Sequence, residues 1–125
     1  MTLYPSLDEV LSAHERLLVL FGGTQGIRDR GALEAALARP QSGYYRDVIE
    51  QAAALLESLS QNHPFVDGNK RAAIAVTAAF LRINGFRLEF DDIEAYHFLI
   101  QLYESNQFRW ERLEPWLREH AHPVR

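Results

Sequence analysis

Residues 63–71 read His-Pro-Phe-Val-Asp-Gly-Asn-Lys-Arg and separate two strongly apolar segments. The segments 47–62 and 72–83 carry alanine, leucine, isoleucine or valine around most of a helical circumference. This pattern is typical of central rather than surface helices, and facing alanines allow two such helices to pack closely. We therefore predict two buried antiparallel helices joined by a short loop. Pro64 is expected to end the first helix and Gly85 the second.

The sequence before this pair predicts two more helices. Ser6 and Glu9 have the spacing of a capping box, and apolar residues then recur at helical spacing as far as Phe21, where two glycines follow. Asp29 is placed to cap a short second helix, which Pro40 is expected to end.

The sequence after the pair predicts a short extended segment and two helices. Apolar and charged residues alternate over 86–90, and Asp91 is placed to cap the helix that follows. A last helix is expected from about Glu111, and Pro115 is tolerated there only if it lies in the first turn. The predicted fold class is all-α, a compact bundle of about six helices around the central antiparallel pair.

Composition limits the kind of protein this is. The chain has 125 residues and 47% of them are hydrophobic, which predicts a single domain over 1–125 with its own core. It has no cysteine, which excludes disulfides and thiolate metal sites, and a net charge of −4, which argues against a nucleic-acid partner. No apolar run is long enough to span a membrane, and residues 1–5 lack the features of a signal peptide. We therefore expect a soluble, cytoplasmic protein.

The loop between the two apolar segments carries groups suited to chemistry on a phosphate. His63 is expected at the rim of a pocket, where an imidazole can remove a proton from a hydroxyl group. Asp67 is a candidate oxygen ligand for Mg²⁺, which often takes one protein carboxylate and completes its shell with phosphate and water. Phe65 is expected to turn inward and anchor the loop.

The residues that follow are suited to holding an anion. Gly68 and Asn69 permit a left-handed turn, and the positive end of the next helix begins just after them. Lys70 is the only lysine of the chain, and with Arg71 it lies in the first helical turn, where a cation opposes the helix dipole unless a bound phosphate compensates. A plain helix connection is the alternative, with Asp67 as the N-cap and both cations solvated.

Residues 63–71 resemble the signature of the Fic/Doc superfamily, H-x-F-x-[DE]-G-N-[GK]-R-x-x-R, without gaps. Residues 22–34 are similar to the corresponding segment of the death-on-curing (Doc) toxin branch. The resemblance implies the Fic fold, with Mg²⁺ as cofactor and ATP as co-substrate. It implies roles for seven residues: His63 as the base, Phe65 as the anchor, Asp67 as the Mg²⁺ ligand, and Gly68, Asn69, Lys70 and Arg71 as contacts of the nucleotide phosphates.

The resemblance leaves two reactions open. Fic proteins that transfer AMP have glycine at the position of Lys70 and a second arginine at the position of Ile74, so this chain is closer to Doc, a kinase. A Doc-like toxin transfers a phosphoryl group to a Ser/Thr hydroxyl of elongation factor Tu and halts translation. Pro64 and Gly68 are closer to the AMP-transferring pattern. A binding module that keeps the loop only as structure is the third hypothesis.

The chain lacks the [ST]-x-x-x-E-[GN] sequence that blocks the nucleotide site in many relatives. The resemblance to Doc therefore implies a separate Phd-like antitoxin whose C-terminal segment folds on binding.

Other polar residues are expected to be structural. His14 and His97 lie within predicted helices and are assigned packing or surface roles. Four arginines precede the first central segment: Arg28, Arg30, Arg39 and Arg46. They could line a substrate approach, but we expect them to be solvated.

Overall fold

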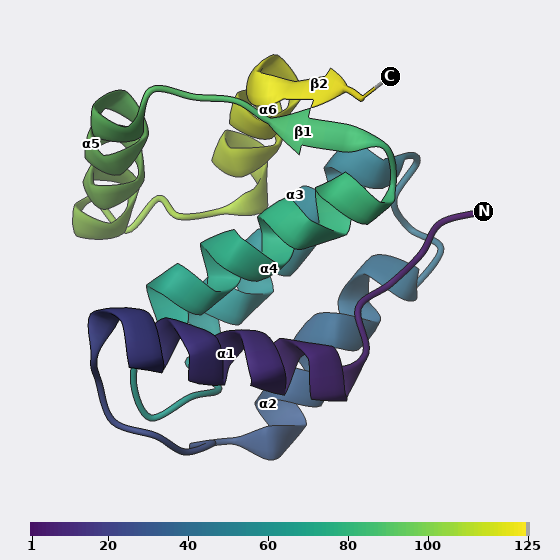
Figure 1. Cartoon of the computed structure of the whole chain (residues 1–125). Helices are drawn as coiled ribbons and strands as arrows, with labels where there is room; N and C mark the ends of the chain where they lie inside the picture. The colour runs from purple at the N-terminus through teal and green to yellow at the C-terminus, as the bar shows by residue number, and fades with distance from the viewer. Residues whose placement is uncertain (125) are drawn as a thin grey trace.

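The computed structural model describes residues 1–124. Over this range it contains six α-helices, one 3-10 turn and a two-stranded antiparallel sheet (Figure 1). In chain order the elements are α1 (Leu7–Phe21), α2 (Arg30–Ala38), η1 (Arg39–Gln41), α3 (Val48–Gln61), α4 (Asn69–Ile83), β1 (Phe86–Leu88), α5 (Asp92–Glu104), α6 (Trp110–His120) and β2 (Ala121–Pro123). The prediction of a helical bundle of about six helices is confirmed. None of the helices in the described range combines the length and apolar character that crossing a bilayer requires.

The helix boundaries follow from local sequence. Ser6 accepts a hydrogen bond from the N–H of Glu9, whose side chain caps Ser6 in return, so the predicted capping box is confirmed. Asp29 and Asp91 accept hydrogen bonds in the first turns of α2 and α5, as predicted. Gly85, with φ 89°, ends α4 in the left-handed region, which glycine enters at little cost.

α3 and α4 form the centre of the molecule, as the two apolar segments predicted (Figure 1). Five alanines of this pair are at most 1% exposed: Ala52, Ala53, Ala54, Ala72 and Ala73. α1 and α2 lie on one side of the pair in Figure 1, and α5, α6 and the sheet lie on the other. The loop that joins α3 to α4 therefore emerges between two layers of structure, which both supply groups to it.

The sheet joins the end of the chain to the segment after α4. β1 pairs with β2 in antiparallel register, with Arg87 opposite His122. The extended segment predicted over 86–90 is confirmed for residues 86–88, which form β1, whereas the sequence does not predict β2. Its three residues form a strand because α6 brings them beside β1, and no alternating pattern within them signals this.

The expectation for Pro115 is wrong. This proline lies five residues after Trp110, the first residue of α6, and therefore beyond the first turn. Leu113 and Leu117 are fully buried, and Trp116 stacks on Phe98 with 5.5 Å between ring centroids. This packing holds the segment helical although Pro115 cannot donate its backbone hydrogen bond.

Candidate functional site

The loop that joins α3 to α4 is bound along its backbone by residues 22–29, the segment between α1 and α2. The N–H of Val66 donates to the carbonyl of Gly26 at 3.0 Å. The N–H groups of Arg28 and Asp29 both donate to the carbonyl of Pro64, at 2.8 and 3.0 Å. The loop is thus fixed by a segment nearly 40 residues earlier in the sequence, beyond the reach of local pattern reasoning.

Phe65 is 1% exposed and points into the core. The imidazole of His14, on α1, stacks on its ring with 3.7 Å between centroids and 7° between planes. His14 is itself 4% exposed, so the packing role expected for it is confirmed, whereas His97 is exposed. His14 also donates from Nε2 to the carbonyl oxygen of Asp67 at 2.8 Å, since a carbonyl can only accept. Sequence reasoning did not foresee this contact with the loop.

Asn69 closes the loop through its side chain. Its Oδ1 accepts from the N–H of Phe65 at 2.9 Å, and its Nδ2 donates to the carbonyl of Phe65 at 3.0 Å. The carboxamide is therefore engaged within the protein. The main-chain N–H of Asn69 and the second hydrogen of its Nδ2 make no hydrogen bond within residues 1–124.

Asp67 is not the N-cap of α4. That position belongs to Gly68, whose φ of 75° is the left-handed conformation the sequence predicted. The plain-connection alternative, which placed Asp67 as the cap, is wrong on this point. Asp67 instead accepts from the N–H of Thr24 at 3.1 Å and from that of Gly68 at 2.8 Å. These two N–H groups, together with the charge of Arg71, lower the pKa of Asp67 below its usual range, so its exposed carboxylate is ionised at neutral pH.

The N-terminus of α4 differs from those of the other described helices. Side chains cap α1, α2, α3 and α5, and the carboxylate of Glu57 accepts from the N–H of Trp110, the first residue of α6. At α4 no side chain accepts from the first turn in the described part of the chain. Its N–H groups and the positive end of its dipole are thus open to an anionic ligand.

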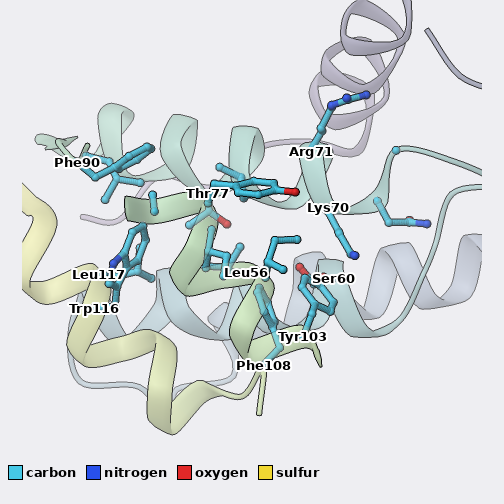
Figure 2. A pocket seen from close by; sticks show the side chains of 18 of the residues that line it. Leu56, Ser60, Lys70, Arg71, Thr77, Phe90, Tyr103, Phe108, Trp116 and Leu117 are labelled. Carbon is cyan, nitrogen blue, oxygen red and sulfur yellow. The ribbon is translucent and has the colours of Figure 1, made fainter. Parts of the chain in front are cut away.

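The two cations at this helix start contact aromatic rings on opposite sides. Lys70 Nζ lies 4.2 Å from the centroid of Tyr103, on α5, and the Arg71 guanidinium lies 4.7 Å from the centroid of Phe21, on α1. Figure 2 shows Lys70 reaching toward Ser60 and Tyr103 while Arg71 points away from them. Both side chains are largely exposed, and each ring holds its cation near the helix start.

A cavity of about 650 Å³ opens beside this helix start, between α4 and α5. Six of the seven predicted site residues line it, namely His63, Asp67, Gly68, Asn69, Lys70 and Arg71, and Phe65 lies outside it in the core. The rest of its wall is mainly apolar and includes Leu56, Phe90, Phe108 and Trp116 (Figure 2). A pocket of this size, apolar with polar groups at one end, is typical of a small-molecule site.

Three buried hydroxyl groups line this cavity and lack a hydrogen-bond partner within residues 1–124. They belong to Ser60, Thr77 and Tyr103. Burial raises the pKa of Tyr103, and the nearby Ser60 hydroxyl offsets part of this effect. A buried polar group without a partner is costly, so these hydroxyls are candidates for contacts with a ligand. Sequence reasoning missed all three, and the only signal was Thr77, a lone polar residue within the apolar stretch 72–81 of α4.

The expectation that the four arginines are solvated is wrong for Arg39, whereas Arg28 is exposed and also binds two backbone carbonyl groups. Arg28 donates from Nε to the carbonyl of His63 at 2.6 Å and from Nη2 to that of Asn62 at 2.7 Å. Arg39 is partly buried and donates to Glu57 at 2.6 Å. Arg30 pairs with the exposed Glu34, and the exposed Arg46 pairs with the buried carboxylate of Glu50 on α3. None of the four lines the cavity among the described residues, so the idea of an arginine-lined substrate approach is not supported.

The sequence of this chain is similar to those of known proteins. A family model described as "Fic/DOC family" matches residues 4–81. The protein "Toxin Doc" of Mycolicibacterium smegmatis is 46% identical over 96 residues, which cover 73% of this chain and 72% of that protein. The "Protein kinase doc" of Escherichia phage P1 is 33% identical over 93 residues, which cover 71% of this chain and 73% of that protein.

Proposed function

Because the chain belongs to the Fic/DOC family, we propose that it is a Doc-type toxin that transfers the γ-phosphoryl group of Mg-ATP to a Ser/Thr hydroxyl of a protein. The names of its two relatives support a toxin and a phosphotransferase. Lys70 and Ile74 support phosphoryl transfer over AMP transfer, because the AMP-transferring pattern has glycine and arginine at these positions.

One observation carries the proposal: a histidine and an uncapped helix N-terminus line the same cavity. His63 is exposed at this cavity, and its imidazole makes no hydrogen bond within residues 1–124. The first turn of α4 presents free N–H groups together with Lys70 and Arg71. A base beside an anion cradle is the arrangement that phosphoryl transfer to a hydroxyl requires, since catalysis there depends on positioning and charge stabilisation.

The residues present fit a magnesium ion. Asp67 is ionised, lines the cavity and already accepts two backbone hydrogen bonds, which orient its carboxylate and leave further lone pairs free. Magnesium is usually held by one or two carboxylates together with substrate phosphates and water. When bound, the ion would neutralise charge on the phosphates.

The apolar part of the cavity suits the base of the nucleotide. A volume of about 650 Å³ is ample for a purine ring, and Phe108 and Tyr103 offer aromatic faces. The hydroxyls of Ser60 and Tyr103, which have no partner in the described residues, are available to form hydrogen bonds with the nitrogens of the purine ring. Lys70, which lies over Tyr103, is placed between this region and the phosphate site.

The proposed reaction is a single displacement at the γ-phosphorus. His63 removes the proton from the hydroxyl of the target, and the hydroxyl oxygen forms a bond to the γ-phosphorus. The bond from that phosphorus to the oxygen bridging the β- and γ-phosphates breaks, and ADP leaves with the bonding electron pair. Lys70, Arg71 and the N–H groups of α4 stabilise the charge on the phosphate oxygens.

The test uses ATP that carries a radioactive label at either the α- or the γ-phosphate. The full chain is incubated with Mg²⁺, each ATP and purified elongation factor Tu, which we propose as the target, with His63→Ala as the control. We expect γ-label on the factor and none with the variant. Label from the α-position would identify an AMP transferase, the candidate that Pro64 and Gly68 favour, and no label would favour a binding module. If a different protein carries the label, elongation factor Tu is excluded as the target, and the proposed reaction stands.

We further propose a Phd-like antitoxin as the partner of this chain, because one relative is named "Toxin Doc" and the resemblance to Doc implies such an antitoxin. Its binding segment is expected to fold on the toxin. Co-expression of the reading frame adjacent to this gene should restore growth and yield a complex that co-purifies. If growth stays inhibited and no complex forms, this partner is excluded.

A further inference from the structure

Arg28 connects the segment between α1 and α2 to the end of α3. Its Nε donates to the carbonyl of His63 at 2.6 Å, and its Nη2 donates to the carbonyl of Asn62, the C-cap of α3, at 2.7 Å. Its own N–H donates to the carbonyl of Pro64 at 2.8 Å. One residue thus binds three consecutive carbonyl groups, and its charge lies at the negative end of a helix dipole.

His63 needs such support because its backbone is in an unfavourable conformation. Its φ is 46°, in the left-handed region that residues with a side chain rarely adopt. Such a conformation persists only where the surroundings hold it. Pro64 restricts the backbone conformations open to His63, the residue before it. Arg28 binds the carbonyl group of Asn62, which precedes the His63 Cα, and that of His63, which follows it.

The direction of the His63 imidazole depends on this backbone. Within residues 1–124 no hydrogen bond holds the ring, and the residue is exposed. The backbone conformation therefore decides where the Cβ points and which part of the cavity mouth the ring can reach. A displacement of about 1 Å at a catalytic group can cost on the order of 100-fold in rate.

We propose that Arg28 is a positioning residue that holds His63 in the orientation needed to remove the proton of the target hydroxyl. The expected effect of Arg28 on catalysis rests on the proposed function. Its effect on the orientation of His63 rests on the hydrogen bonds alone. Arginine is required because its planar fork reaches two adjacent carbonyls at once, whereas the ammonium of a lysine lacks that fixed geometry.

The test compares Arg28→Ala and Arg28→Lys with Arg30→Ala. Arg30 is a matched control because it is an exposed arginine two residues away that pairs only with Glu34 in the described chain. For each variant we measure urea unfolding, the NMR signals of the histidine imidazoles, and kcat and KM for labelled phosphoryl transfer. The signals of His63 and His14 are assigned by their loss in the variants His63→Ala and His14→Phe.

We expect both Arg28 variants to shift the His63 signals, leave those of His14 in place, and lower kcat at least tenfold while the KM for ATP changes less than about twofold. Arg30→Ala should match the wild type in all three measurements. Unchanged His63 signals in a folded Arg28 variant, or equal shifts of His14, would overturn the proposal. If Arg28→Ala does not fold, Arg28→Lys decides. If the wild type transfers no phosphoryl group, the proposed function fails, and the NMR comparison still tests the link to His63.

Discussion

His14 donates a hydrogen bond of 2.8 Å from Nε2 to the main-chain oxygen of Asp67, which lies 53 residues later in the sequence. The same imidazole stacks on Phe65. A single residue of α1 therefore fixes both the buried anchor of the loop and the backbone of its carboxylate. The loop acquires its shape from this contact as well as from its own sequence.

Replacing His14 should destabilise the fold in two separable steps. His14→Phe keeps a stacked ring and loses the hydrogen bond, which predicts a loss of about 1 kcal/mol in the free energy of unfolding. His14→Ala also removes the stacked ring and leaves a gap, which predicts a loss of about 2 to 4 kcal/mol. Urea unfolding measures both, with the exposed His97→Ala as the control, which should be neutral. Equal stability of the alanine variant and the wild type would contradict the packing role.

Replacing His63 should remove activity and leave the fold intact. The side chain is exposed and its ring makes no hydrogen bond in the described residues, so His63→Ala should unfold at the same urea concentration as the wild type. Loss of a general base predicts a fall of at least about 100-fold in phosphoryl transfer. Growth inhibition on expression should disappear with it. Toxicity that survives this substitution would exclude His63 as the base.

Asp67 should make the stability of the protein depend on acid pH. Hydrogen bonds from Thr24 and Gly68 lower the pKa of Asp67 in the folded state, so its ionised form is stabilised by folding. This contribution is present above the usual carboxyl pKa of about 4 and is lost as pH falls through the lower pKa of the folded state. Asp67→Asn should therefore be less stable than the wild type at pH 6, and the difference should shrink toward pH 3. A difference independent of pH would contradict this assignment.

Removing a hydroxyl from the cavity should stabilise the free protein and weaken nucleotide binding. Thr77 is 1% exposed and its hydroxyl has no hydrogen-bond partner in residues 1–124, so the isosteric Thr77→Val should raise the free energy of unfolding by about 1 kcal/mol. Calorimetric titration with a non-hydrolysable ATP analogue and Mg²⁺ measures binding, which should weaken if the hydroxyl contacts the nucleotide. Destabilisation by this substitution would show that the hydroxyl is satisfied.

Replacing the proline within α6 should stabilise the helix. Pro115 cannot donate its backbone hydrogen bond, and an alanine there restores a donor and raises helix propensity. Part of that gain is offset because proline also restricts the unfolded chain. Pro115→Ala is expected to raise the free energy of unfolding by about 1 to 2 kcal/mol in urea titrations. A loss of stability would mean that the ring of Pro115 itself packs favourably.

The sequence determined most of the secondary structure of this protein, because the signals involved are local. A capping side chain and the N–H groups that it binds lie within three residues of one another, as at Ser6, Asp29 and Asp91. The apolar circumference of α3 and α4 likewise identified the central pair. Six of the residues that line the cavity, His63 and residues 67–71, were also predicted, because one short segment carries these six.

Only the tertiary structure decided how that segment is held and what surrounds it. The fork of Arg28, the stacking of His14 and the N–H of Thr24 all come from α1 or the segment after it, and Tyr103 comes from α5. Burial of Leu113 and Leu117 likewise kept the segment around Pro115 helical, and burial of Thr77 left its hydroxyl without a partner in the described residues. Contacts of this kind depend on which distant surfaces meet, a property of the packed chain that no local pattern of residues encodes.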